Sequence, residues 1–122
     1  MSTRSLIGME VEEGKILATY CHFDGYPSHN GKILLESYTD SEKIKTLISL
    51  GGFSSLEVDI DKIEFYASEP DEGLEIELYI SEKDYLKRCG MIDYLYLWKN
   101  DKWYVASKKR FVELISFLTE FE

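Results

Sequence analysis

The stretch "DYLYLWKNDKWYVA", residues 93–106, decides the fold because a two-residue turn signal separates two alternating apolar segments. With Asn100 and Asp101 in the turn, Trp98 opposes Trp103. Counting outward gives the further pairs Lys99 with Lys102, Leu97 with Tyr104 and Tyr96 with Val105. One face of this predicted hairpin is aromatic, and we expect it to pack in the core. A platform on which nucleic-acid bases stack is the alternative reading.

The first segments of the chain predict a second hairpin. In residues 4–11 Leu6 and Gly8 alternate with Ile7 and Met9, and a turn at Gly14 leads into a strand over residues 15–23. Strand alternation predicts that Cys21 and Phe23 face the core. It places His22 on the opposite face, together with Arg4 of the first strand.

The remaining elements complete an α+β fold. Thr39 and Glu42 have the spacing of a capping box at a helix start, and Gly51 and Gly52 end that helix. The predicted segments are helices at 30–38, 39–50, 82–89 and 109–121 and strands at 56–66 and 74–80. We therefore predict an antiparallel sheet built from β-hairpins, with three or four short helices packed mainly on one face. The length indicates a single globular domain, residues 1–122.

The composition predicts a folded globular protein, and we expect it to be cytoplasmic. Apolar residues make up 44% of the chain and aromatic residues 14%. We find no apolar run near the ~20 residues that span a bilayer and no signal-peptide pattern, which predicts no membrane association. Cys21 and Cys89 stand far apart in the sequence, which favours free thiols in a reducing compartment.

The net charge of −9 is concentrated in the middle of the chain. Residues 51–93 carry 12 acidic and 4 basic side chains. Such a surface repels phosphate, which argues against generic nucleic-acid binding and favours a basic protein partner. The predicted protein-interaction residues are Glu69, Asp71, Glu72, Glu75 and Glu77. The simpler alternative is that these acids only keep the protein in solution.

The stretch "TYCHFDGYPSHNGK", residues 19–32, gathers most of the chemically active side chains. Strand alternation separates Cys21 from His22, and no second Cys/His pair exists, so we predict no metal, no cofactor and no catalytic residue. An Arg, a His and hydroxyl groups in one place suit an anionic or planar ligand. The ligand-binding candidates are Arg4, His22, Asp24, Tyr26 and His29, and the alternative is a loop that only turns the chain.

Three segments resemble a family of small proteins encoded by phages, prophages and mobile elements. They are "STRSLIG" (2–8), "YCHFDGYPSHNGKIL" (20–34) and, more loosely, "YLYLWKNDKWYV" (94–105). The acidic middle of the chain has no counterpart in the resemblance. The family carries no assigned enzymatic activity, so the resemblance implies an accessory gene of a mobile element that acts in the host cytoplasm.

Three functional hypotheses follow. The first is a stoichiometric counter-defence inhibitor of the anti-CRISPR type, which occupies the basic nucleic-acid channel of a host defence protein. The second is a module that binds or sequesters a small molecule, a cyclic or modified nucleotide, through the region of Arg4, His22, Asp24 and Tyr26. The third is a small hydrolase-like enzyme centred on His22 and Asp24. The sequence favours a non-enzymatic protein and is compatible with a homodimer.

Overall fold

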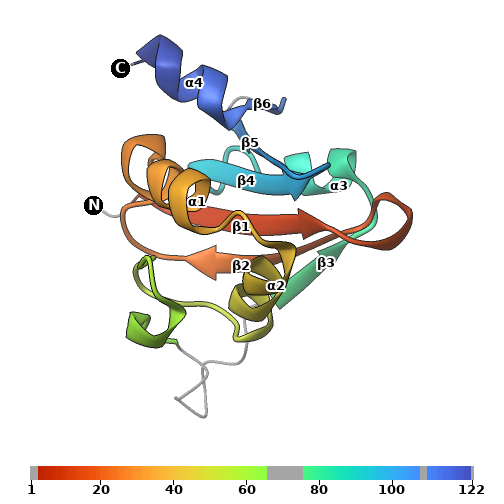
Figure 1. The fold of residues 1–122 in the computed structure, drawn as a ribbon. Coiled ribbons are helices and arrows are strands. Elements are labelled where there is room, and N and C mark those ends of the chain that lie inside the picture. Colours follow the sequence, from red (N-terminus) through yellow and green to blue (C-terminus); the bar gives the residue numbers. More distant parts are fainter. Residues whose placement is uncertain (1–2, 66–75, 108–109, 122) are drawn as a thin grey trace.

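The computed structural model of the protein describes residues 3–65, 76–107 and 110–121. For residues 120 and 121 it describes the backbone alone. The strands are β1 (Ser5–Glu10), β2 (Ile16–Cys21), β3 (Ile76–Tyr79), β4 (Tyr94–Lys99), β5 (Lys102–Ala106) and β6 (Val112–Glu113). The helices are α1 (Lys32–Ser37), α2 (Ser41–Ser49), α3 (Glu82–Leu86) and α4 (Leu114–Phe121). Short helical turns lie at Glu12–Gly14, Pro27–Gly31 and Ile60–Lys62. The predicted α+β class is confirmed (Figure 1).

The six strands form one mixed sheet in the order β3-β2-β1-β4-β5-β6. Both predicted hairpins are present as antiparallel pairs, β1 with β2 and β4 with β5. The pairing of β1 with β4 is parallel, where the sequence predicted an antiparallel sheet throughout. The reason is the connection through α3. This connection carries the chain from the edge strand β3 back to the end of the sheet at which β1 begins. β4 therefore runs in the same direction as β1.

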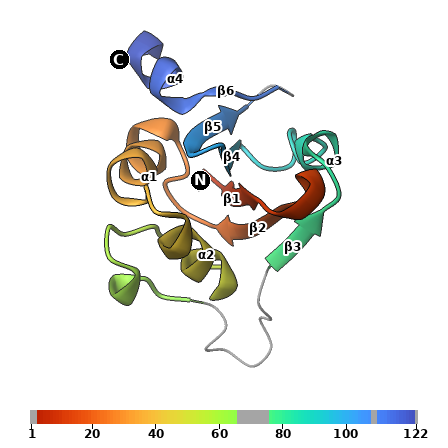
Figure 2. The ribbon, with the colours of Figure 1, turned by 45° about the vertical axis from the view of Figure 1, so that its right-hand side comes forward.

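Helices cover both faces of the sheet. Figure 2 shows α1 and α2 on one side and α3 on the other. The larger core lies under α1, α2 and α4 and contains Ile7 and Tyr96, both fully buried. The smaller core lies under α3 and contains Leu6 and Leu95. Alternation along β1 was therefore predicted correctly, and three of the four helices pack on the same face.

The β4–β5 hairpin has the predicted register. Trp98 opposes Trp103, and the pairs on either side also agree. Asn100 and Asp101 both have positive φ, 53° and 59°, as a two-residue turn between twisted strands requires. Trp98 and Trp103 are 7% and 2% exposed, so the aromatic face belongs to the core, where each large side chain contributes about 1.5–3 kcal/mol.

The structure corrects three local predictions. The expected strand at 56–66 is absent from its described residues 56–65, where the only strand-like contact is an isolated bridge between Phe53 and Phe65. The final helix begins at Leu114 and not at 109, because Val112 first pairs with Val105 as part of β6. The N-cap of α2 is Asp40, whose carboxylate accepts from the Glu42 N–H at 3.0 Å. Thr39 lies one residue outside the cap.

No helix within the described ranges is both long enough and apolar enough to cross a membrane.

Candidate functional site

The loop after β2 leaves the sheet at once. The backbone N–H groups of His22 and Phe23 donate to the carbonyl oxygens of Phe53 and Ser54, at 3.1 and 2.7 Å. Cys21 is fully buried, as predicted. Phe23 is 44% exposed, so its predicted core position is wrong, because strand alternation ends where the chain turns toward Phe53.

A buried polar network fixes this loop to the end of the sheet. Asn30 is fully buried, and its amide nitrogen donates to Ser5 Oγ at 3.3 Å and to Cys21 Sγ at 3.4 Å. The Tyr96 hydroxyl donates to the Gly25 carbonyl oxygen at 2.6 Å. Buried polar groups with partners stabilise one loop conformation. The burial of Asn30 was not predicted from the sequence, because Asn is a common residue in turns.

The five predicted ligand-binding residues occupy separate settings. Arg4 donates its backbone N–H to Asp93 Oδ2 at 2.8 Å and its guanidinium to the Met91 carbonyl. His22 Nδ1 lies 2.7 Å from the Tyr20 hydroxyl. The structure thus directs Arg4 toward the start of β4, while the described contacts of His22 lie along β2 and with Phe23.

The other three candidates lie in the turn itself. Asp24 has a φ of 56°, which marks it as a turn residue. Tyr26 is 39% exposed, and its ring centre lies 6.0 Å from that of His29. His29 Nδ1 lies 2.9 Å from Asn30 Oδ1, which joins it to the buried network. Among these five residues, the rings of Tyr26 and His29 lie in contact with each other.

The Cys21 thiol is in its unreactive form. Burial raises the pKa of the Cys21 thiol to about 11, so the thiol stays protonated at neutral pH, and the thiolate is the reactive form. Across the described residues, no three His, Cys, Asp or Glu side chains gather closely enough to hold a metal ion.

Four of the five predicted protein-interaction residues, Glu69, Asp71, Glu72 and Glu75, lie outside the described residues. The fifth, Glu77, lies on β3 and pairs with Arg88, whose nitrogen is 2.8 Å from Glu77 Oε1. Glu77 Oε2 also accepts from the Tyr79 hydroxyl at 2.9 Å. Its charge is therefore partly neutralised within the fold.

A second group of exposed carboxylates lies in residues 36–64, which include α2 and the segment after it. We call it the α2 acidic surface and define it as the exposed Glu36, Asp40, Glu42, Glu57, Asp59, Asp61 and Glu64. Residues 36–64 hold only three basic side chains, those of Lys43, Lys45 and Lys62. The Lys43 ammonium donates to the carbonyls of Ser37 and Val58, at 2.8 and 2.9 Å, which ties the two acidic segments together.

The acidic surroundings affect Tyr38, whose hydroxyl donates to the Glu57 carbonyl oxygen at 2.7 Å. Burial and then the nearby carboxylates of Asp59 and Glu57 raise the pKa of Tyr38 to about 12. Negative charge here disfavours a further anion. The α2 acidic surface therefore favours cationic groups.

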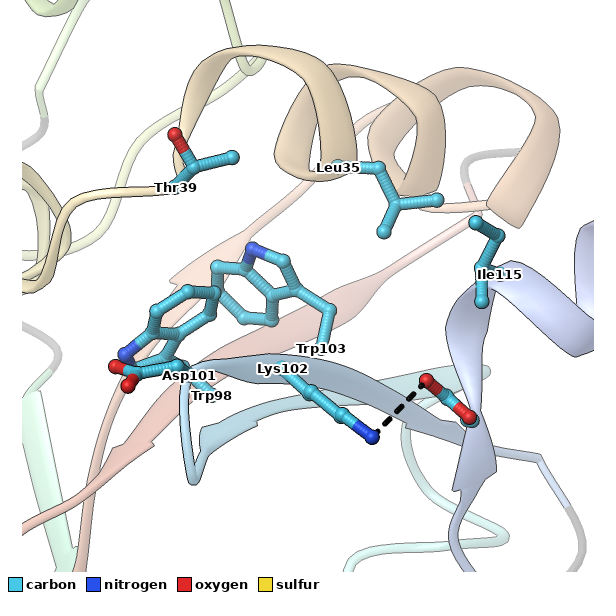
Figure 3. A pocket seen from close by; sticks show the side chains of 8 residues that line it. Leu35, Thr39, Trp98, Asp101, Lys102, Trp103 and Ile115 are labelled. Atoms are coloured by element: carbon cyan, nitrogen blue, oxygen red, sulfur yellow. Dashed lines mark ion pairs between the residues drawn. The ribbon is translucent and has the colours of Figure 1, made fainter.

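A pocket of about 300 Å³ lies between α1, the tip of the β4–β5 hairpin and the start of α4. Figure 3 shows the rings of Trp98 and Trp103 on one side, with Leu35 and Ile115 across from them. β6 pairs only Val112 and Glu113 with β5, and the chain then turns into α4 beside Trp103, where the pocket lies. The sequence predicted both tryptophans as core and gave no sign of the opening beside them.

No protein-family model, no curated protein and no solved structure matches this chain.

Proposed function

We propose that the protein binds a basic partner stoichiometrically through the α2 acidic surface. The observation that carries this proposal is the excess of exposed carboxylates over lysines in residues 36–64. The partner that best fits this chemistry is a protein with a nucleic-acid channel, because such channels are lined by Lys and Arg. Carboxylates held on a folded surface compete with phosphates for those cations.

The resemblance to mobile-element proteins gives the proposal its biological setting. A host defence effector of the CRISPR type is the partner we propose, and the proposed effect is loss of its nucleic-acid binding. The acidic side chains of residues 66–75, which the sequence also predicts to bind a partner, lie outside the described residues.

Two observations favour this proposal over the other hypotheses. The Arg4 guanidinium donates to the Met91 carbonyl, which leaves it less able to bind a nucleotide phosphate. The Cys21 thiol is buried and protonated, which disfavours a cysteine nucleophile beside the His22 and Asp24 centre of the enzyme hypothesis.

The test is displacement of labelled target DNA from a purified, guide-loaded Cas9-type effector, followed by fluorescence anisotropy. The key variant is Glu57→Gln/Asp61→Asn, since both side chains are exposed and neither carboxylate has an ion-pair partner among the described residues. The matched control is Glu12→Gln/Glu13→Gln, which removes the same charge from the β1–β2 turn.

We expect displacement that saturates at a fixed stoichiometry and weakens as salt rises. The key variant should need about tenfold more protein, since two exposed charges contribute up to about 1 kcal/mol each. The control should behave as the wild type. Absence of displacement across a panel of such effectors, or an equal effect of both variants, would refute the proposal.

A further inference from the structure

The pocket beside the hairpin tip has an aromatic wall and an apolar wall. The rings of Trp98 and Trp103 meet at 60° with their centres 5.4 Å apart. Trp98 keeps 7% of its surface accessible and Trp103 only 2%, so a bound molecule would meet Trp98 first. Leu35 of α1 and Ile115 of α4 face the rings, and Ile115 is 56% exposed (Figure 3).

The polar groups of the pocket leave an unbalanced negative charge. Lys102 Nζ lies 3.8 Å from Glu113 Oε2, so these two charges offset each other (Figure 3). Asp101 lines the same pocket and forms no ion pair with any residue the structure describes. Its carboxylate is thus available to an incoming cation.

We propose that this pocket binds the guanidinium group of an arginine side chain. Guanidinium is flat, is weakly hydrated compared with an ammonium ion, and stacks on aromatic rings, which matches Trp98. Its fork of N–H donors fits a carboxylate with two bonds, which matches Asp101. The volume lies at the lower end of the ~300–1,000 Å³ of small-molecule sites, so it suits one side chain better than a dinucleotide.

The pocket adjoins the α2 acidic surface. Leu35 and Thr39 of the pocket directly precede Glu36 and Asp40 of that surface in the chain. The identity of the arginine donor rests on the proposed function, because the arginine would come from the same basic partner. The preference of the pocket for guanidinium stands on its own contacts.

The chain supplies its own reporter, because Trp98 and Trp103 are its only tryptophans. Tryptophan fluorescence of the full chain should change with saturation as N-acetyl-arginine amide is added. The neutral citrulline analogue is the shape control. N-acetyl-tryptophan amide in solution controls for collisional quenching.

The variant Asp101→Asn removes the charge and keeps the turn, since Asn readily adopts the positive φ of this position. We expect it to bind the arginine probe about fivefold more weakly. Asp61→Asn, which lies outside the pocket lining, should bind it as the wild type does. Thermal unfolding of each variant checks that it is folded.

A fluorescence change that never saturates, an equal response to citrulline, or unchanged binding by Asp101→Asn would overturn the inference. Equal binding of N-acetyl-lysine amide would overturn the preference for guanidinium. The two proposals fail separately. A negative titration with successful DNA displacement removes only the pocket inference, and a positive titration without displacement removes only the proposed partner.

Discussion

The hydrogen bond from Tyr96 to the Gly25 carbonyl gives the sharpest test of how the 22–31 loop is held. The hydroxyl and the carbonyl oxygen are 2.6 Å apart, and the ring is fully buried. Burial raises the pKa of Tyr96 well above its ordinary value, so the hydroxyl remains a donor at any working pH. Tyr96→Phe removes the donor and keeps the ring.

We expect Tyr96→Phe to lower the free energy of unfolding by about 2 kcal/mol. A typical hydrogen bond contributes about 1 kcal/mol net, and a buried carbonyl left without a partner costs about 1–3 kcal/mol. With a urea m-value of about 2 kcal/mol per molar, the midpoint should fall by about 1 M. Limited proteolysis should cut the variant faster within residues 22–31.

The matched control is Tyr104→Phe. Tyr104 is half-buried, and its hydroxyl has no hydrogen bond to the described residues, so the expected change is within about 0.5 kcal/mol. Equal midpoints for Tyr96→Phe and the wild type, or equal losses in the two variants, would refute the account of the loop.

Three further predictions concern the same regions. Gly25→Ala should destabilise the fold by about 1–3 kcal/mol in urea unfolding, because its Cβ would lie 2.8 Å from Ser5 Cβ and from the Thr3 carbonyl oxygen. Stability should fall between pH 9 and 11 by up to about 1.4 kcal/mol per unit, because the unfolded chain loses the Cys21 proton at 9.0 and the folded chain keeps it up to about 11. Unfolding measured at pH 8 and pH 10 should show this loss in the wild type and a smaller one in Cys21→Ala. Asp101→Gly should stabilise the hairpin by about 0.5–1 kcal/mol, since Gly adopts the φ of 59° without strain. The same variant should bind the arginine probe more weakly in the fluorescence titration, because it lacks the carboxylate.

Local signals were sufficient for the two hairpins. The turn at Asn100 and Asp101 fixes which residues face each other, because hairpin partners lie equally far from the turn. Alternation then placed Ile7 and Leu6 on the correct faces of β1. These inferences needed only residues close together in the chain.

Contacts between distant residues were not predictable from the sequence. The parallel pairing of Ser5 with Tyr94 has no turn to fix it, and both strands are apolar on both faces. Asn30 is buried where its side chain contacts Ser5 and Cys21, and the residues next to it in the sequence do not indicate either contact. The pocket depends on where β6 ends, and β6 has only two residues. Sequence patterns do not locate the end of a strand that accurately.

The central position of β1 has a consequence for how the chain folds during synthesis. β1 can pair with β2 as soon as residue 21 is available, but its other edge waits for β4, 89 residues further along. Until β4 has been synthesised, this edge of β1 exposes a row of unpaired backbone N–H and C=O groups, and other nascent chains can pair with them. Assembly of the sheet should therefore be slow and sensitive to chaperones, and the yield of folded protein should depend on expression rate more than its final stability suggests.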